Sequence, residues 1–227
     1  MPPDGLLIEP ATHPRQDCRY GLAAADARGA IYKIGGSTTF GRDYTKISGD
    51  GSELPDDAEL GPGLDDWRCT RDNQTNLIWE VKLNMPSSLS HFAHRFTWYS
   101  PDVSSHGGNP GVIGPTHLCN EILEGCSTYD LVQTINMPEN GLCGAHDWRV
   151  PRRRELQSLL DYQKLGLPRI DSTWFLDGGP TEFGYYSSAT VASNPTFVWT
   201  LMPGGEFYAA GKDAGRHVRL VRLEAPK

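Results

Sequence analysis

The chain contains no long apolar segment. Among its 227 residues, no run approaches the roughly 18 consecutive apolar residues that a membrane-spanning helix needs. Basic residues are also scarce, since 28 Asp and Glu outnumber 21 Lys and Arg and the formal net charge is −7. A general nucleic-acid binder needs a basic face for phosphate contacts. We therefore expect neither a membrane span nor a nucleic-acid partner.

Sequence motifs of common enzyme classes are absent as well. Neither Ser187 nor Ser188 stands in a nucleophile-elbow sequence. The pair Gly204-Gly205 is too short for a phosphate-binding loop. His91 and His94 are three residues apart but have no carboxylate in regular spacing, and the cysteines form no Cys-x-x-Cys pair. The sequence therefore favours a protein that is not an enzyme and uses no metal or cofactor.

The cysteines indicate an oxidising compartment. Cys119 and Cys126 bracket a short loop that a local disulfide can close, and Cys69 and Cys143 are the candidates for a long-range bridge. Cys18 is then left over. Two such bridges are typical of a protein outside the cytosol. The alternative, five buried thiols in a cytosolic protein, stays open at this point.

The first residues, Met1 to Gly5, lack the basic and apolar regions of a signal peptide. Either the protein is cytosolic or a signal has been removed before this sequence begins. Together with the cysteines, this start favours a secreted or cell-surface protein, with the periplasm as a further compatible location.

Residues 1–66 are expected to form an extended arm that wraps the core. They are rich in Gly, Asp and Pro and too poor in apolar residues to fold alone. Within them, 20–28 resembles a short helix and 30–34 a short strand. The acidic stretch 48–66 is expected to be loop.

Residues 67–227 are expected to form the folded domain. A hairpin comes first, with Leu77, Trp79 and Val81 on one face of its second strand. A long loop spans 101–115, and a helix is expected after Ser127, which begins a capping box. A second helix is expected after Pro151, with Gly166 marking its end. Late strands are expected at 185–188, 196–201, 206–209 and 217–222. This order predicts an α+β fold rather than a parallel α/β fold.

The segment Leu142–Tyr162, with the sequence LCGAHDWRVPRRRELQSLLDY, resembles a known family. Together with Cys69–Asn73, Leu77–Lys82 and the terminal Val218–Arg222, it is similar to the C-terminal domain family of the Legionella collagen-like adhesin. The function of that family is largely unknown. The resemblance covers about two-thirds of the chain, from Trp67 to the C-terminus.

The same helix entry is also similar to the Arg-Leu-Pro-Thr-Glu motif of formylglycine-generating-enzyme-like domains, which have a C-type-lectin-like fold. The resemblance therefore implies two helices packed on a twisted antiparallel sheet, with ligands bound by the late strands and loops. Two positions depart from the pattern. No cysteine follows Cys143, so the copper-dependent oxidation chemistry has no ligands, and Arg152 replaces the polar helix cap expected after Pro151.

Two groups of residues are candidates for ligand binding. Arg152, Arg153 and Arg154 are cations in a first helical turn, which is unfavourable next to the helix dipole. They indicate either an anion-binding patch, for example for an acidic polysaccharide, or a solvated charge cluster. The second group lies in the late strands, where aromatic faces alternate with polar groups that suit sugar hydroxyls. Its members are Tyr185, Tyr186, Thr190, Asn194, Glu206 and Tyr208, together with Trp199 and Phe207.

Because strand alternation buries about half of such aromatics, we expect Trp199 to be buried and either Tyr185 or Tyr208 to be exposed. The interpretation that follows is a bacterial binding or adhesion domain that recognises an extracellular glycan or protein without catalysis. A structural subunit of a surface appendage or envelope complex is the alternative. A homo-oligomer is compatible with both.

Overall fold

The computed structural model describes residues 42–162, 164, 166–175 and 184–224. These residues form an α+β fold with two helices and two antiparallel sheets, of five and three strands, which confirms the expected fold class. Residues from Tyr44 onward form one compact unit. The helix and strand expected at 20–28 and 30–34, and Cys18, lie outside the described residues.

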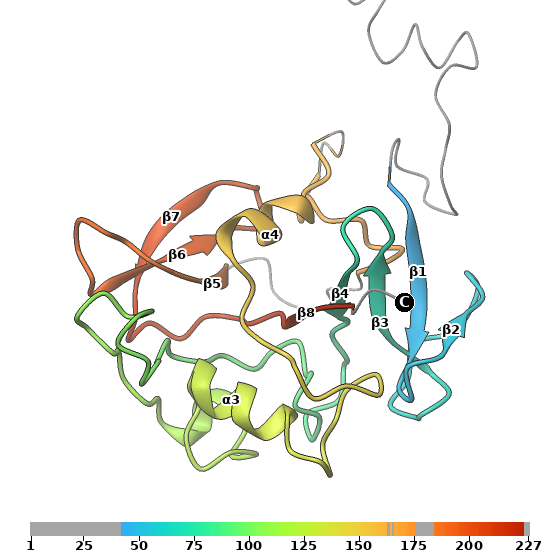
Figure 1. The fold of residues 1–227 in the computed structure, drawn as a ribbon, viewed down its shortest axis with the longest axis horizontal. Helices are drawn as coiled ribbons and strands as arrows, with labels where there is room; N and C mark the ends of the chain where they lie inside the picture. The colour runs from blue at the N-terminus through green and yellow to red at the C-terminus, as the bar shows by residue number, and fades with distance from the viewer. Residues whose placement is uncertain (1–41, 163, 165, 176–183, 225–227) are drawn as a thin grey trace, which may run out of the picture. The chain divides into compact units, whose positions relative to one another are not determined.

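The larger sheet has the strand order β2-β1-β3-β4-β8. Its strands are β1 (Tyr44–Ser48), β2 (Glu53–Leu54), β3 (Trp67–Asp72), β4 (Leu77–Glu80) and β8 (Val221–Leu223). The expected hairpin is thus present as β3–β4, turning through a polar segment in which the Asp72 carboxylate accepts backbone N–H groups of Gln74 and Thr75. The last strand of the chain closes the sheet against β4 (Figure 1).

Strand β1 lies within residues 1–66, which the sequence analysis assigned to an extended arm. It pairs with β3 along its whole length, and its Tyr44 and Ile47 side chains are buried. Burial of this apolar material, together with the β1–β3 ladder, makes residues 44–48 part of the sheet. Most of the acidic stretch that follows is loop, as expected, apart from the two residues of β2.

The smaller sheet contains β5 (Tyr185–Thr190), β6 (Phe197–Leu201) and β7 (Phe207–Gly211), in that order. All three strands were expected from the sequence. Helix α4 contacts β5 and β6 (Figure 1). The two faces of the smaller sheet therefore have different neighbours. One face packs against α4, and the other packs against the central core.

Both expected helices are present, α3 (Thr128–Ile135) and α4 (Arg153–Ser158). At α3 the expected capping box forms, because Ser127 Oγ accepts the Asp130 N–H while the Asp130 carboxylate accepts the Ser127 N–H. The prediction that the second helix ends at Gly166 is wrong. The chain leaves the helix at Ser158 and Leu160 pairs with Ile170 in a bridge instead.

Both faces of β4, and of the segment that leads into β8, lie in the interior. All four residues of β4 are buried, and Val218, Arg219 and Leu220 have no exposed surface. Alternation correctly separates Val218 and Leu220 from Arg219, but the face that Arg219 occupies is also interior. The alternation at 217–222 gives no sign of this, because it distinguishes two faces but does not show whether both are covered.

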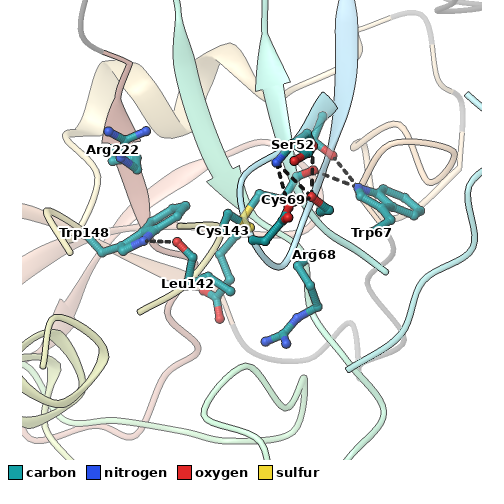
Figure 2. The surroundings of a disulfide bond; sticks show 12 residues. Ser52, Trp67, Arg68, Cys69, Leu142, Cys143, Trp148 and Arg222 are labelled. Carbon is teal, nitrogen blue, oxygen red and sulfur yellow. Dashed lines mark hydrogen bonds between the residues drawn. A yellow bond between two sulfur atoms is a disulfide. The ribbon is translucent and has the colours of Figure 1, made fainter. Parts of the chain in front are cut away.

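Two disulfides staple the domain, Cys69–Cys143 and Cys119–Cys126, and both confirm the expected pairings. The first joins β3 to the loop before Trp148, as Figure 2 shows. Around it, the Trp67 indole donates to the Cys69 carbonyl at 2.9 Å, and the Trp148 indole donates to the Leu142 carbonyl at 2.9 Å (Figure 2). The buried tryptophans thus have polar partners that hold both ends of the bridge in place.

Candidate ligand-binding site

A cavity of about 260 Å³ opens between the loop that follows Trp98, helix α3 and the entry to α4. Its walls are mostly apolar, from Trp98, Tyr99, Tyr129, Val132 and Val150. Its polar lining residues are Ser100, Ser105, Thr128, Arg149, Arg152 and Ser188. Apolar walls with a few convergent polar groups are the usual make-up of a small-molecule site.

Helix α3 is tied to the loop wall of the cavity at Thr128. The Thr128 hydroxyl accepts the Tyr99 N–H at 3.1 Å and donates to the Tyr99 carbonyl at 2.9 Å. The rings of Tyr99 and Tyr129 meet edge to face with centroids 5.9 Å apart. Tyr129 is 37% exposed. An exposed aromatic ring is therefore held in a defined position at the mouth of the cavity.

The loop side of the cavity is also fixed. The Trp98 indole donates to the Ser187 carbonyl at 3.1 Å, and the hydroxyls of Ser100 and Ser105 hydrogen-bond to each other at 2.7 Å. Beneath the loop, the ammonium of Lys212 lies 4.1 Å from the Trp98 ring centroid and donates to the carbonyls of His106 and Asn109. Burial lowers the pKa of Lys212 to about 8.

Two arginines give the cavity its charge. Arg149 forms a two-pronged ion pair with Glu155, with both nitrogen–oxygen distances at 2.8 Å, and Glu155 also accepts the backbone N–H of Arg152. Burial alone would raise the pKa of the Glu155 carboxyl, but these hydrogen bonds outweigh it and lower the pKa below its ordinary value. The Arg152 side chain is exposed at the rim. Arg149 is thus neutralised, and Arg152 supplies the net positive charge.

The aromatic residues predicted to bind a ligand do not form one surface. Thr200 of β6 is paired with Tyr208 of β7 on one side and with Tyr186 of β5 on the other. Tyr185 is paired with the next residue of β6, Leu201. Side chains at paired positions share a face of the sheet, and side chains one position apart point to opposite faces. The Tyr185 and Tyr208 side chains therefore lie on opposite faces. Tyr186 has no exposed surface, and its hydroxyl donates to the carbonyls of Gly211 and Ala214. It belongs to the core.

The remaining predicted residues are scattered around the smaller sheet. Thr190 is connected to the cavity, because its hydroxyl donates to the carbonyl of Ser105 at 3.1 Å. Asn194 and Glu206 are exposed in turns away from the cavity lining. Arg153 lies over the rings of Trp199 and Phe207, at 4.4 and 4.8 Å from their centroids.

The burial expected for individual aromatics is not met. Trp199 is half-buried rather than buried, and so are both Tyr185 and Tyr208. The guanidinium of Arg153 covers the outer part of the Trp199 ring, which explains how a large aromatic residue is accommodated without complete burial. Of the sequence candidates, Arg152 is the one that lines the cavity.

The cavity residues that sequence reasoning missed are Tyr99, Tyr129 and Arg149. Tyr129 falls within the capping-box sequence Ser127–Asp130 and Tyr99 ends the strand-like run that begins at Phe96, and neither pattern points to a ligand. A signal for the site does exist in the length of the 101–115 loop, because long ordered loops in compact domains are often functional. The sequence does not show which residues face this loop across the cavity.

The residues described contain no group of three His, Cys, Asp or Glu side chains that could hold a metal ion. The rings of His91 and His94 are 4.8 Å apart, but the His94 ring donates to the Ser88 carbonyl and the pair lies in the interior. No helix among these residues is long and apolar enough to cross a bilayer.

The fold and its cavity define a disulfide-stapled α+β domain with a preformed small site. Residues 68–222 match the family model of the Lcl C-terminal domain. The match covers more than half of the chain, so the protein belongs to the Lcl C-terminal domain family, as its sequence resemblance indicated. Neither a curated protein nor a solved structure matches the chain, and the similarity to C-type lectins therefore remains a prediction.

Proposed function

We propose that this protein is a secreted or cell-surface bacterial binding domain that recognises a carbohydrate in the cavity between α3 and the 98–105 loop, without catalysis. The observation that carries the proposal is the composition of the cavity. A half-exposed tyrosine at its mouth, serine and threonine hydroxyls along its side and one guanidinium at its rim converge on a single space.

The size and chemistry of the cavity favour a sugar over a flat protein contact. At about 260 Å³ it is close to the lower end of ordinary ligand sites, which suits one or two small rings. Tyr129 offers a face to the C–H surface of a sugar ring, and Ser100, Ser105 and Ser188 offer hydroxyls. Arg152 favours a sugar that carries an acidic group.

The two disulfides support a location outside the cytosol, because such bonds persist in oxidising compartments. Membership of a family named after an adhesin domain supports the same location and a role at the cell surface. The proposal of a non-catalytic role rests on the absence of a nucleophile–base pair around the cavity among the described residues.

A glycan array followed by calorimetric titration tests the proposal. We expect Tyr129→Ala and Arg152→Ala each to weaken binding on the order of tenfold, since each removes a central contact. Arg154→Ala is the matched control, because Arg154 is exposed on the same helix but does not line the cavity. Binding that is unaffected by both cavity variants would place the ligand elsewhere. Turnover of a bound glycan would overturn the non-catalytic role.

A further inference from the structure

The edges of the two sheets differ in how they are protected. Strand β2 has two residues and β8 has three, and β8 is also bridged by Arg149. Strand β5 has an irregular register, and its Tyr186 N–H donates to the His217 carbonyl. Short, irregular or covered edges of this kind are what proteins use to prevent strand addition. Among the described residues, β7 is the long edge that has none of these features.

The outward backbone groups of β7 follow from its register with β6. The Met202 N–H donates to the Glu206 carbonyl, and the Lys212 N–H donates to the Thr196 carbonyl. Because hydrogen-bonded pairs alternate along an antiparallel ladder, Tyr208 and Ala210 point their backbone groups toward β6. Phe207 and Ala209 therefore point theirs away from the sheet, and no described residue outside β6 and β7 hydrogen-bonds to them.

The sequence of β7 does nothing to block a further strand. Phe207–Gly211 has the sequence FYAAG, without a charged residue or proline, and its pairing with β6 is regular throughout. Ala209 is exposed, whereas Phe207 and Tyr208 are half-buried. An edge of this length with apolar side chains is a ready template for another strand.

We propose that β7 pairs with β7 of a second copy of this chain around a two-fold axis, joining the two smaller sheets into one continuous sheet. Tyr208 would then stand opposite Tyr208 of the second copy in a non-hydrogen-bonded pair. Phe207 of each copy would stand opposite Ala209 of the other copy, in hydrogen-bonded pairs. This register satisfies the four outward backbone groups of Phe207 and Ala209 in each strand.

The side chains suit this register in both directions at once. Each large Phe207 faces a small Ala209, and the two Tyr208 rings meet as an aromatic cross-strand pair. Charge is also complementary. Arg216 lies 5.8 Å from the Tyr208 ring centroid, and the exposed Glu206 of the second copy is the diagonal neighbour of Tyr208 on the same face.

A second copy is favoured over an unrelated strand because the register is self-complementary. A two-fold axis at Tyr208 pairs the same three residues of both chains, Phe207–Ala209, and no further sequence has to be supplied. The interface is separate from the carbohydrate cavity, whose lining includes no residue of β7.

Sedimentation velocity over a concentration series tests the proposal on the intact chain. We expect a species of twice the 25.0 kDa chain mass at high concentration. Ala209→Pro removes the outward N–H without breaking the β6 ladder, and it should weaken dimerisation on the order of tenfold or more. Ala209→Ser keeps both the N–H and the small side chain and should leave the dimer intact. A chain that stays monomeric throughout, or a dimer that survives Ala209→Pro, would overturn the proposal.

Disulfide trapping tests the register independently of that proline, in a Cys18→Ser background that removes the remaining cysteine. Tyr208→Cys should cross-link under mild oxidation, because Cα atoms of a non-hydrogen-bonded pair are about 4.5 Å apart. Ala209→Cys is the control. It is exposed, but its copies would be about 8 Å or more apart and beyond disulfide reach. Cross-linking of Ala209→Cys that equals or exceeds that of Tyr208→Cys would refute the register.

Discussion

Several charged side chains lie inside the core of this protein. Glu80, Lys82 and Arg219 have almost no exposed surface. One Glu80 oxygen accepts from the Lys82 ammonium at 2.8 Å and the other accepts the Leu220 N–H, while the Glu80 carbonyl accepts from the Arg219 guanidinium at 2.7 Å. Burial lowers the pKa of Lys82, and the nearby Glu80 carboxylate opposes that effect. The carboxylate is therefore the group that makes burial of this lysine tolerable.

We predict that Glu80→Gln destabilises the domain by about 3–5 kcal/mol, because it leaves a buried cation without its counter-charge. Chemical denaturation measures the loss. The matched control is Glu53→Gln, which breaks the ion pair with Arg71 at a position where the Glu53 side chain is 54% exposed. That change should cost less than about 1 kcal/mol. Equal losses in the two variants would show that the buried carboxylate has no special role.

Two interior histidines predict how stability depends on pH. Burial is the main cause that lowers the pKa values of His94 and His217 from 6.5 to about 4, and the His217 ring also hydrogen-bonds to the His94 carbonyl. Between these pH values the unfolded chain holds more protons than the folded one. Stability is therefore lost as the pH falls from about 6.5 toward 4.

Denaturation midpoints measured at pH 7 and pH 4.5 check this dependence. His217→Gln removes one of the interior titrating rings, so its midpoint should change less between the two pH values than that of the native chain. The exposed His146→Gln serves as the control and should follow the native chain. A His217→Gln variant with an unchanged pH dependence would contradict the assignment.

At the scale of single elements, the short helices depend on their first turns. The Ser127 hydroxyl and the Asp130 carboxylate cap α3 reciprocally. We predict that Ser127→Ala costs about 1 kcal/mol in unfolding free energy and also weakens ligand binding, because α3 presents Tyr129 to the cavity. Gln133→Ala, at an exposed position of the same helix, should leave both quantities unchanged. Thermal melts and titration with the bound glycan provide the two measurements.

The sequence allowed the elements to be predicted better than the site. The capping box, the turn after Asp72 and the strands of the smaller sheet are local signals, and each appears where it was expected. The last strand, expected at 217–222, is confined to Val221–Leu223. The cavity depends instead on contacts between distant segments, such as the Trp98 indole with the Ser187 carbonyl. The opposite orientation of Tyr185 and Tyr208 likewise depends on strand register, which the pattern of aromatic residues does not specify.

At the scale of the whole molecule, the two disulfides close loops of very different length. Cys69 and Cys143 are 74 residues apart, whereas Cys119 and Cys126 are seven apart. In the chain-entropy model, the first bridge stabilises the fold by about 4–5 kcal/mol and the second by about 2–3 kcal/mol. Replacing each pair with alanine, in a Cys18→Ser background, should reproduce that order in chemical denaturation. The reverse order would show that local packing around Cys119–Cys126 outweighs the entropy of the loop.

The larger sheet also determines how the domain responds to a pulling force. Tyr44, where β1 begins, pairs with Asp72; Asp72 pairs with Leu77, and Leu77 pairs with Leu223 of the last strand. The first residue of β1 and the last residue of β8 therefore lie at the same level of the sheet. Tension applied at Tyr44 and Leu223 acts across the strands, so it pulls neighbouring strands apart instead of sliding them past one another. Cys69–Cys143 then limits the extension. The 74-residue segment that it encloses cannot lengthen, which shortens the fully stretched chain by about 250 Å at roughly 3.4 Å per residue.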